Sequence, residues 1–370
     1  MMGNDNITAY QYLSMYSFNT DSYYAFGKTP VSVQSIYETV TANPLVTWET
    51  AKTWNIGFSS QFLNGKLGLD LDYFQSNRND ILITRNASIP TYSGLSLPAE
   101  NLGKVKNHGF EAIATYRDSK GDFEWGVTGN VTYAKNEVVY ADEAADTPAW
   151  QRETGHPIDG GTYYKALGIY QTQEQIESTP HLSGTKIGDL IYQDTNKDGN
   201  ITWDDAVRRD KSATPKWIFG LTLNGSWKGM DVNAFFQGQA DAEILVQPTM
   251  NMATDFYEGR WIGSNTAEQN AAAKWPRAFM KASSVDNRNS QSSTWWLRDA
   301  SFVRLKSLEI GYTFPKTLIS PLGVEKLRLY VNGNNLFTID SVGIFDPEMT
   351  NGIRGYSLQR SWTFGLNVTF

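Results

Sequence analysis

The segment from Asp194 to Asp205 carries the residues best suited to bind a metal ion. It reads Asp-Thr-Asn-Lys-Asp-Gly-Asn-Ile-Thr-Trp-Asp-Asp, with side-chain oxygens at positions 1, 3, 5 and 12 and glycine at position 6. Calcium prefers several oxygen ligands, and this is the spacing of a twelve-residue calcium loop, whose glycine permits the sharp turn. The candidate calcium ligands are Asp194, Asn196, Asp198, Asn200, Thr202 and Asp205.

Two features of this segment leave a second interpretation open. Asp205 stands where such loops usually carry glutamate, so its side chain is shorter, and no long amphipathic helix follows it. The same residues would also suit a solvated turn on the protein surface. Calcium is the one cofactor that the sequence predicts, with the solvated turn as the alternative.

Four tryptophans are candidates for contact with a substrate: Trp261, Trp275, Trp295 and Trp296. An indole ring offers a flat apolar face on which the C–H face of a sugar ring can stack. The alternative is that these rings pack the connecting segments against one another or lie at a membrane interface. We favour this packing interpretation and keep the four residues as candidates for substrate contact.

The remaining polar residues show no pattern typical of catalysis. The three histidines share no ligand spacing, and the chain has no cysteine. Five carboxylates fall on the polar side of expected strands, where we expect them to face a lumen, and none suggests a catalytic pair: Asp70, Asp72, Glu111, Glu124 and Glu309. A net charge of −7 without a basic run argues against a nucleic-acid partner. We therefore predict that the protein is not an enzyme and binds no nucleic acid.

The last ten residues indicate the kind of element that must position these candidates. Trp362, Phe364, Leu366, Val368 and Phe370 alternate with small or polar residues. This period of two is typical of a strand with one apolar and one polar face. Aromatic residues at both ends of the apolar face are typical of a transmembrane β-strand. An edge strand of a soluble sandwich is the alternative for this segment alone.

Eight further segments alternate in the same way, and the lengths of their connections follow a pattern. Short connections fall at 64–65, 119–121, 228–229 and 315–321, and they alternate with long ones at 86–106, 139–214, 241–298 and 340–356. In an up-and-down order, all the long connections lie at one end, as extracellular loops do in outer-membrane barrels. The sequence thus predicts an all-β fold, a transmembrane antiparallel up-and-down β-barrel with about nine strands here.

The remaining features indicate how much of a barrel this chain contains. No apolar run approaches the roughly 18 residues of a transmembrane helix, and no signal peptide is recognisable. Residues 1–47 show no sustained periodicity, so we expect an irregular extracellular loop region that follows a missing strand. Bacterial single-chain barrels have even numbers of strands. We therefore expect residues 48–370 to be the C-terminal part of a larger barrel.

Several ordered motifs resemble those of one protein family. They are NPLVTWE at 43–49, NLGKVKNHGFE at 101–111, GD at 188–189, DTNKDG at 194–199, LRDASFVRLK at 297–306, GYTFP at 311–315, GNNLF at 333–337 and the terminal Phe370. Together they resemble the SusC/RagA family of TonB-linked outer-membrane proteins, which are nutrient importers of Bacteroidetes. The resemblance covers nearly the whole chain.

The resemblance implies a 22-strand barrel with an N-terminal plug, to which this chain would contribute the C-terminal strands. It also implies a location in the cell outer membrane of a Gram-negative, Bacteroidetes-like bacterium, surrounded by outer-membrane lipid. The implied activity is uptake of an oligosaccharide or a peptide together with a SusD-like surface lipoprotein. The TonB complex would drive this uptake through the missing N-terminal region. A surface binding or adhesin scaffold that does not transport is the alternative.

Overall fold

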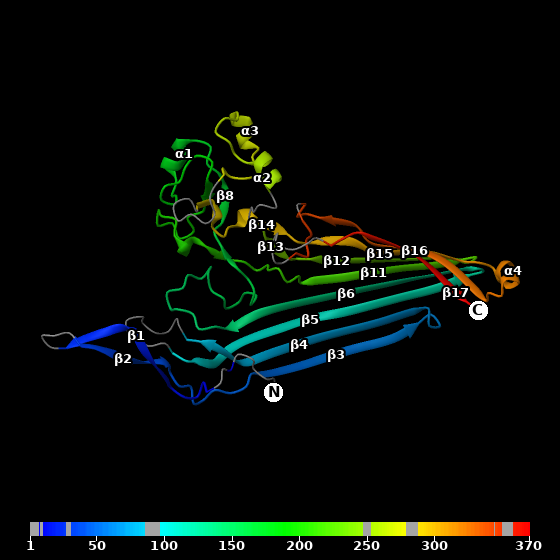
Figure 1. The fold of residues 1–370 in the computed structure, drawn as a ribbon, viewed down its shortest axis with the longest axis horizontal. Helices are drawn as coiled ribbons and strands as arrows, with labels where there is room; N and C mark the ends of the chain where they lie inside the picture. Colours follow the sequence, from blue (N-terminus) through cyan, green and yellow to red (C-terminus); the bar gives the residue numbers. More distant parts are fainter. Residues whose placement is uncertain are drawn as a thin grey trace. The chain divides into compact units, whose positions relative to one another are not determined.

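Nine long strands form the principal sheet of the protein (Figure 1). The computed structural model describes residues 7, 10–26, 31–85, 97–246, 253–278, 288–343, 345–349 and 358–370. The nine strands are β3 (Thr50–Phe62), β4 (Leu67–Thr84), β5 (Ala99–Lys120), β6 (Phe123–Tyr140), β11 (Trp217–Trp227), β12 (Met230–Ala240), β15 (Phe302–Thr313), β16 (Lys326–Asp340) and β17 (Ser361–Thr369).

The order of these strands in the sheet follows their order in the sequence. Each pair from β6 to β17 is antiparallel and in continuous register, apart from bulges near Phe235 and Leu305. Short turns join alternate pairs of strands, such as β11 and β12. The predicted all-β, antiparallel up-and-down order with nine strands is confirmed.

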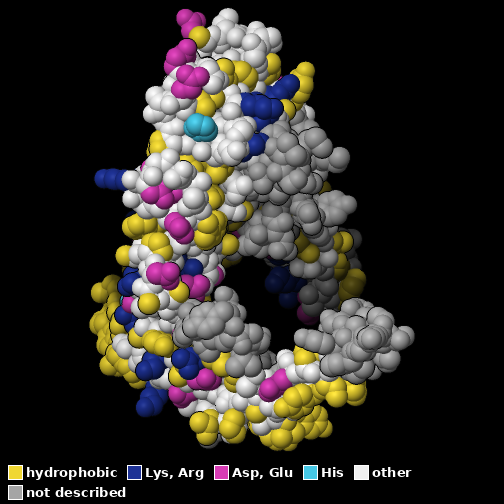
Figure 2. Space-filling view, turned by 90° about the vertical axis from the view of Figure 1, so that its left-hand side faces the viewer, with side chains coloured by type: hydrophobic (Ala, Val, Ile, Leu, Met, Phe, Trp, Pro, Cys, Tyr) yellow, Lys and Arg dark blue, Asp and Glu magenta, His cyan; other side chains and the backbone are white. Residues whose placement is uncertain are grey.

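Apolar and polar side chains segregate to opposite faces of this sheet. On β17, the exposed fractions of Trp362, Phe364 and Leu366 are 57%, 81% and 58%. Among the described residues no second sheet covers these side chains, so the sandwich interpretation of this strand does not hold. Figure 2 shows hydrophobic side chains gathered in yellow patches on the surface of one face of the molecule. A protein that leaves such a face open requires an apolar environment for it.

Strands β4 and β5 are longer than the alternating pattern predicts. β4 continues to Thr84 and β5 begins at Ala99, so part of the expected loop at 86–106 is strand, and residues 86–96 lie outside the described residues. Asn101, in the added part of β5, shows how this part of the sheet is held. Its side-chain amide donates to the carbonyl oxygens of Thr47 (2.8 Å) and Asp80 (2.7 Å). The added part of β4 contains three consecutive apolar residues, Ile81, Leu82 and Ile83, so it lacks the alternation on which the sequence analysis relied.

The two longest connections contain regular elements that the sequence analysis did not predict. Residues 139–214 hold β7 (Thr162–Tyr163), β8 (Ala166–Ile169), α1 (Gln173–Ser178), β9 (Leu190–Tyr192), the 3-10 helix η2 (Trp203–Asp205) and β10 (Val207–Arg208). Residues 241–298 hold β13 (Glu243–Leu245), α2 (Ala253–Gly259), α3 (Ala267–Ala271), η4 (Arg288–Ser290), η5 (Thr294–Trp296) and most of β14 (Leu297–Asp299). Two more short helices, α4 (Lys316–Ile319) and η6 (Ser320–Leu322), join β15 to β16.

These two connections share one hydrophobic core, which we call the loop core. Its fully buried members include Val246, Trp275, Trp296 and Ala300. The indole rings of Trp275 and Trp296 stack with centroids 5.6 Å apart. Backbone hydrogen bonds join the connections directly, since Tyr164 N donates to Ser292 O and Thr294 N donates to Tyr164 O. The long loops of the prediction are therefore a folded region.

Residues 15–40 also differ from the expected irregular region. β1 (Met15–Phe26) and β2 (Val31–Val40) form an antiparallel hairpin. Its register shifts between Met15 and Tyr16 and again between Asn19 and Tyr23. These shifts interrupt the regular pairing of the two strands. The prediction that residues 1–47 lack regular structure was wrong for this hairpin.

The chain divides into two compact units. One comprises Met1–Asn55, Phe74–His108 and Asn136–Ile158, and the other comprises Ile56–Tyr73, Gly109–Lys135 and Asp159–Phe370. The loop core belongs entirely to the second unit. None of the helices among the described residues combines the length and apolar character that crossing a membrane requires.

We predict that Trp296→Ala destabilises the loop core by about 3–5 kcal/mol, because it removes a stacked indole and the Trp296 Nε1 bond to Asn289 O. Hydrogen exchange at the amide of Val246, which bonds Trp296 O, would measure this loss. Trp362→Ala is the matched control, because that ring lies on the exposed face of β17 and should leave exchange in the loop core unchanged. Unchanged protection in Trp296→Ala would contradict the prediction.

Candidate functional site

The polar face of the sheet carries an ion-pair network that spans three strands. Arg328 on β16 donates from Nε to Asp231 Oδ1 on β12 (3.0 Å) and from Nη2 to Glu309 Oε1 on β15 (2.7 Å). Gly311 lies between them on β15, and a Cβ atom there would be only 2.4 Å from Arg328 Nη2. Glycine at this position thus lets the guanidinium group cross β15. The network links strands and presents charge on the face that the sequence predicts to line a lumen.

Other carboxylates expected on this face also bond across strands. Asp70 on β4 accepts a hydrogen bond from the Ser59 hydroxyl on β3. The Asp72 carboxylate lies over Gly57, whose missing side chain leaves room for it. Glu124 lines a hollow of about 320 Å³ at the short-turn end. These contacts give the carboxylates roles in strand pairing and surface charge.

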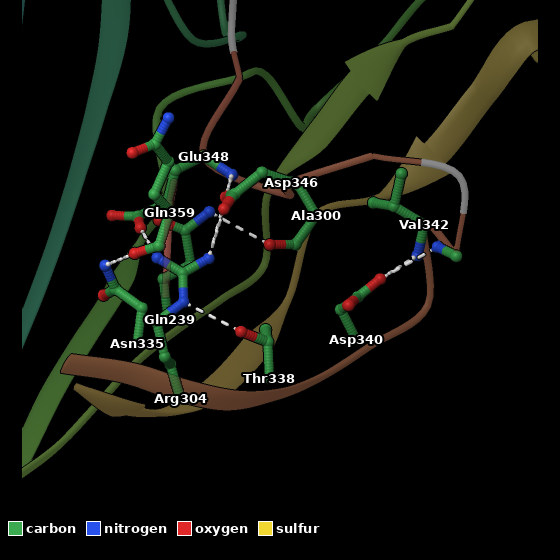
Figure 3. A network of polar contacts seen from close by, with 11 residues as sticks. Gln239, Ala300, Arg304, Asn335, Thr338, Asp340, Val342, Asp346, Glu348 and Gln359 are labelled. Carbon is green, nitrogen blue, oxygen red and sulfur yellow. Dashed lines mark hydrogen bonds and ion pairs between the residues drawn. The ribbon is translucent and has the colours of Figure 1, made fainter. Parts of the chain in front are cut away.

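A buried arginine fixes the last long connection to the sheet (Figure 3). Arg304 on β15 is 1% exposed, and its Nη2 donates to both carboxylate oxygens of Asp346 at 2.8 Å. Its Nε donates to Thr338 Oγ1 on β16 (2.8 Å), and its Nη1 binds Glu348. Its guanidinium carbon lies 4.9 Å from the centroid of the Phe302 ring. Arg304 therefore holds residues 346–348 against β15 and β16.

Asp189 is a buried charged residue that holds segments of the loop core together. Its side chain is completely buried, its Oδ1 lies 2.6 Å from Arg277 Nε, and it accepts a bond from Asn289 Nδ2 (2.8 Å). The preceding Gly188 has φ of +89°, and a Cβ there would be 2.5 Å from Trp261 Cε3. Sequence analysis recognised the Gly-Asp pair as part of a motif. It did not predict that Asp189 joins segments about 90 to 100 residues away along the chain.

Three buried tyrosines lie in the same region: Tyr164, Tyr170 and Tyr192. The sequence analysis did not identify them as candidates. Burial raises the pKa of Tyr164, Tyr170 and Tyr192, so each hydroxyl stays protonated at neutral pH. Tyr192 uses its proton to donate a hydrogen bond to Arg288 O at 2.6 Å. Tyr170 likewise donates to Pro180 O at 3.4 Å, so both hydroxyls act as structural donors.

The four candidate tryptophans divide into two groups. Trp275 and Trp296 are 2% and 0% exposed and lie in the loop core, so neither ring presents a free face to a ligand. The packing alternative therefore describes these two residues, and substrate contact does not. Trp261 and Trp295 are half-buried and pack against the same core. One side of the Trp261 ring covers Gly188, and its Nε1 donates to Gln171 Oε1. Substrate contact stays a prediction for Trp261 and Trp295.

The proposed calcium loop is closed by bonds between its own side chains and backbone. Asp194 accepts from the amides of Lys197 (2.6 Å) and Gly199 (2.9 Å). Asn196 accepts from the amide of Asp198, and Asp198 accepts from that of Asn200. Gly199 has φ of +84°, as the sharp turn requires.

Asp205 closes the same loop from the buried side. Its Oδ1 accepts from the amide of Thr195 (2.7 Å) and its Oδ2 from that of Thr202 (2.8 Å). Thr202 is also the N-cap of η2, and its hydroxyl accepts from Asp204 N. Across the ranges that the structure describes, no three His, Cys, Asp or Glu side chains are grouped to hold a metal ion. Calcium binding therefore stays a prediction, and the surface-turn alternative stays open.

A hollow of about 230 Å³ in the loop region is a ligand-contact candidate that sequence analysis missed. Tyr163, Lys165, Arg209 and Thr294 line it together with two small apolar side chains. Arg209 is held in place by Glu243, with Nη2 to Oε1 at 2.6 Å and Nε to Oε2 at 3.2 Å. An aromatic ring beside fixed charged groups can bind hydroxyl, amide or carboxylate groups of a small ligand. These residues come from segments far apart in the sequence, so no local motif indicates the hollow.

Comparison with known proteins gives one family and several relatives. Residues 8–336 match the family model described as TonB dependent receptor-like, beta-barrel. TonB-dependent receptor P3 of Formosa agariphila is 28% identical over 404 aligned residues, covering 100% of this chain and 38% of the relative. TonB-dependent receptor SusC of Bacteroides thetaiotaomicron is 26% identical over 379 aligned residues, covering 100% and 36%. The chain thus spans less than two fifths of the length of these curated relatives.

A solved structure shows the same fold. The RagAB peptide transporter aligns with a TM-score of 0.70 and 20% identity, covering 100% of this chain and 39% of that one. At this level of identity, the match concerns the arrangement of strands and loops. It agrees with the antiparallel nine-stranded sheet and with the folded connections described above.

We predict that Asp189→Asn lowers the free energy of unfolding of the loop core by about 3 kcal/mol, because it removes the completely buried carboxylate that pairs with Arg277 and accepts from Asn289. Denaturant unfolding followed by hydrogen exchange of this region would measure the change. Asp198→Asn is the matched control, since Asp198 is exposed and should change stability by at most about 0.5 kcal/mol. Equal effects of the two variants would contradict this role for Asp189.

If the loop at 194–205 binds calcium, adding the ion to chelator-treated protein should change the fluorescence of Trp203, which is 54% exposed and adjoins Asp204 and Asp205. Loops of this kind in extracellular modules bind at about 10⁻⁴–10⁻³ M. Trp203→Phe should abolish the signal and identifies its source among the 12 tryptophans. Absence of any change at millimolar calcium would eliminate the site.

Proposed function

The chain belongs to the TonB dependent receptor-like β-barrel family, and on this premise we propose that it forms part of the wall of an outer-membrane nutrient importer. The cargo that we propose is an oligosaccharide or a peptide. The observation that carries the proposal is the nine-stranded sheet with one exposed apolar face and one face crossed by charged side chains. Lipid on one side and a polar interior on the other would suit these two faces.

The ion pairs support this assignment of the two faces. A charged side chain that faces hydrocarbon is costly, by about 2–4 kcal/mol for Arg or Lys at the middle of a bilayer. Arg328, Asp231 and Glu309 all lie on the face opposite the apolar side chains of the same strands. Charge on the polar face of a transmembrane barrel tunes what passes through it.

The folded loops supply the surface on which we propose that cargo binds. The long connections lie at the end of the sheet opposite the short turns, which is the extracellular end in outer-membrane barrels. The hollow lined by Tyr163, Lys165, Arg209 and Thr294 has about the volume of one sugar ring or one amino-acid side chain. Among the relatives, the RagAB protein is a peptide transporter, which supports peptides as one class of cargo.

We propose two protein partners. A SusD-like surface lipoprotein would cover the extracellular loops, as the likeness to SusC and RagAB suggests. The TonB complex would supply energy to the whole importer. A surface binding scaffold without transport is the second candidate, and the same experiment distinguishes the two.

Uptake by cells gives the direct test. Deletion of the gene should abolish accumulation of its labelled peptide or oligosaccharide cargo, and dissipation of the proton gradient should do the same in the unmodified strain. Binding that persists at the cell surface without energy-dependent accumulation would favour the scaffold. Recovery of the protein outside the outer-membrane fraction would overturn both.

Substitution in the hollow tests the site. Tyr163→Ala should weaken the apparent affinity for cargo by about fivefold to tenfold, because it removes one aromatic contact. Tyr257→Ala is the matched control, since Tyr257 is 66% exposed in the same unit and does not line the hollow. Equal uptake by both variants would remove this hollow from the proposal while leaving transport intact.

A further inference from the structure

The apolar face of the sheet has a hollow at its short-turn end. Its volume is about 410 Å³, and apolar side chains from four adjacent strands line it: Met230, Ile310, Tyr312, Leu329, Val331 and Phe364. The register brings them together, since Met230 pairs with Tyr312, Tyr312 with Leu329, and Val331 with both Ile310 and Phe364. The lining is almost wholly apolar, so a polar solute would gain nothing there.

A cation lies beside this hollow. Lys228 Nζ is 5.4 Å from the centroid of the Trp227 ring, and Trp227 pairs directly with Met230, which lines the hollow. Trp227 is 53% exposed, so the ring and the ammonium group above it are accessible from the apolar side. The nearest carboxylate along the chain, Asp231, is engaged with Arg328 on the opposite face. The charge of Lys228 is therefore not neutralised by Asp231.

Lys228 occupies a turn position with a left-handed backbone conformation, which lysine seldom adopts. Lys228 has φ of +46° and Gly229 has φ of +87°, the conformation of a tight two-residue hairpin turn. Asn, Asp and Gly adopt the left-handed region at the first position more readily than lysine does. The sequence thus places lysine at a position where Asn, Asp or Gly would favour the turn. A cation over an indole ring beside an apolar hollow has the chemistry of a lipid site, with phosphate at one end and hydrocarbon at the other.

We propose that this surface binds one anionic glycerophospholipid, with its phosphate at Lys228 over Trp227 and an acyl chain in the hollow. The inference rests on the proposed membrane position of the sheet, because short turns lie on the periplasmic side of outer-membrane barrels. Glycerophospholipid of the inner leaflet would meet the sheet at this level. A free anion would use only Lys228 and leave the apolar hollow unfilled.

Native mass spectrometry of the intact importer, released from nanodiscs that contain equal amounts of phosphatidylglycerol and phosphatidylcholine, tests the proposal. The unmodified protein should retain phosphatidylglycerol preferentially. Lys228→Asn keeps a residue that suits the turn and should reduce this preference about fivefold, as expected for one basic residue at a lipid surface. Val331→Phe fills part of the hollow and should reduce retention of both lipids.

Lys120→Asn is the matched control, since Lys120 also precedes a turn glycine but ends β5, which two strands separate from β12 and the hollow. It should leave the preference unchanged. An equal loss in Lys120→Asn and Lys228→Asn, or an unchanged preference in Lys228→Asn, would overturn the proposal. Complete displacement of the lipid by inorganic phosphate would also overturn it, because that result would indicate a simple anion site.

Recovery of the protein in the outer-membrane fraction separates this inference from the proposed function. Protein that reaches that fraction and imports cargo without any lipid preference would contradict the lipid site alone. Protein absent from the fraction would contradict the proposed function and, with it, this inference.

Discussion

The hydrogen bonding of backbone groups on an apolar surface is the constraint on which this structure depends. A strand that exposes one side to hydrocarbon cannot leave its N–H and C=O groups unpaired, because each unpaired group costs several kcal/mol there. The strands between the two edge strands, β3 and β17, meet this requirement by pairing on both sides, as β11 does with its neighbours β6 and β12. With the backbone paired, the alternation of side chains alone decides what each face contacts.

On the polar face, glycines of one strand leave room for side chains of neighbouring strands. Gly311 leaves room for Arg328 to reach Asp231 two strands away, and Gly57 leaves room for the Asp72 carboxylate. Gly365 does the same for the ring of Tyr330 on the adjacent strand. Glycine within a strand is usually destabilising, but here each one opposes a large side chain that fills the space. The sheet is thus linked by side-chain contacts as well as by its backbone.

Buried charged residues hold the segments of the long loops in place, outside the hydrogen-bonded sheet. Asp189 and Arg304 are 0% and 1% exposed, and each engages partners from at least two other segments. Such pairs are expensive to desolvate, and their value lies in geometry, because a buried charge accepts only the arrangement that satisfies it. The folded loops surround a small core, so these fixed polar contacts define how their segments meet. A binding surface made from loops needs this precision if it is to select one ligand.

The sequence by itself determined the all-β class, the nine strands with their order and apolar faces, and the family. Each of these follows from local patterns, since alternation such as that of Trp362 to Phe370 decides the environment of a strand without reference to distant residues. The capping boxes at Thr172 and Thr266 are also local, and could have predicted α1 and α3 within the long connections. Only the tertiary structure showed that Trp275 and Trp296 are buried and that β1 and β2 form a hairpin with shifts in its register. Only the tertiary structure joined Asp189 to Asn289, 100 residues away, and Arg304 to Asp346, because contacts between distant segments depend on how the whole chain closes around them.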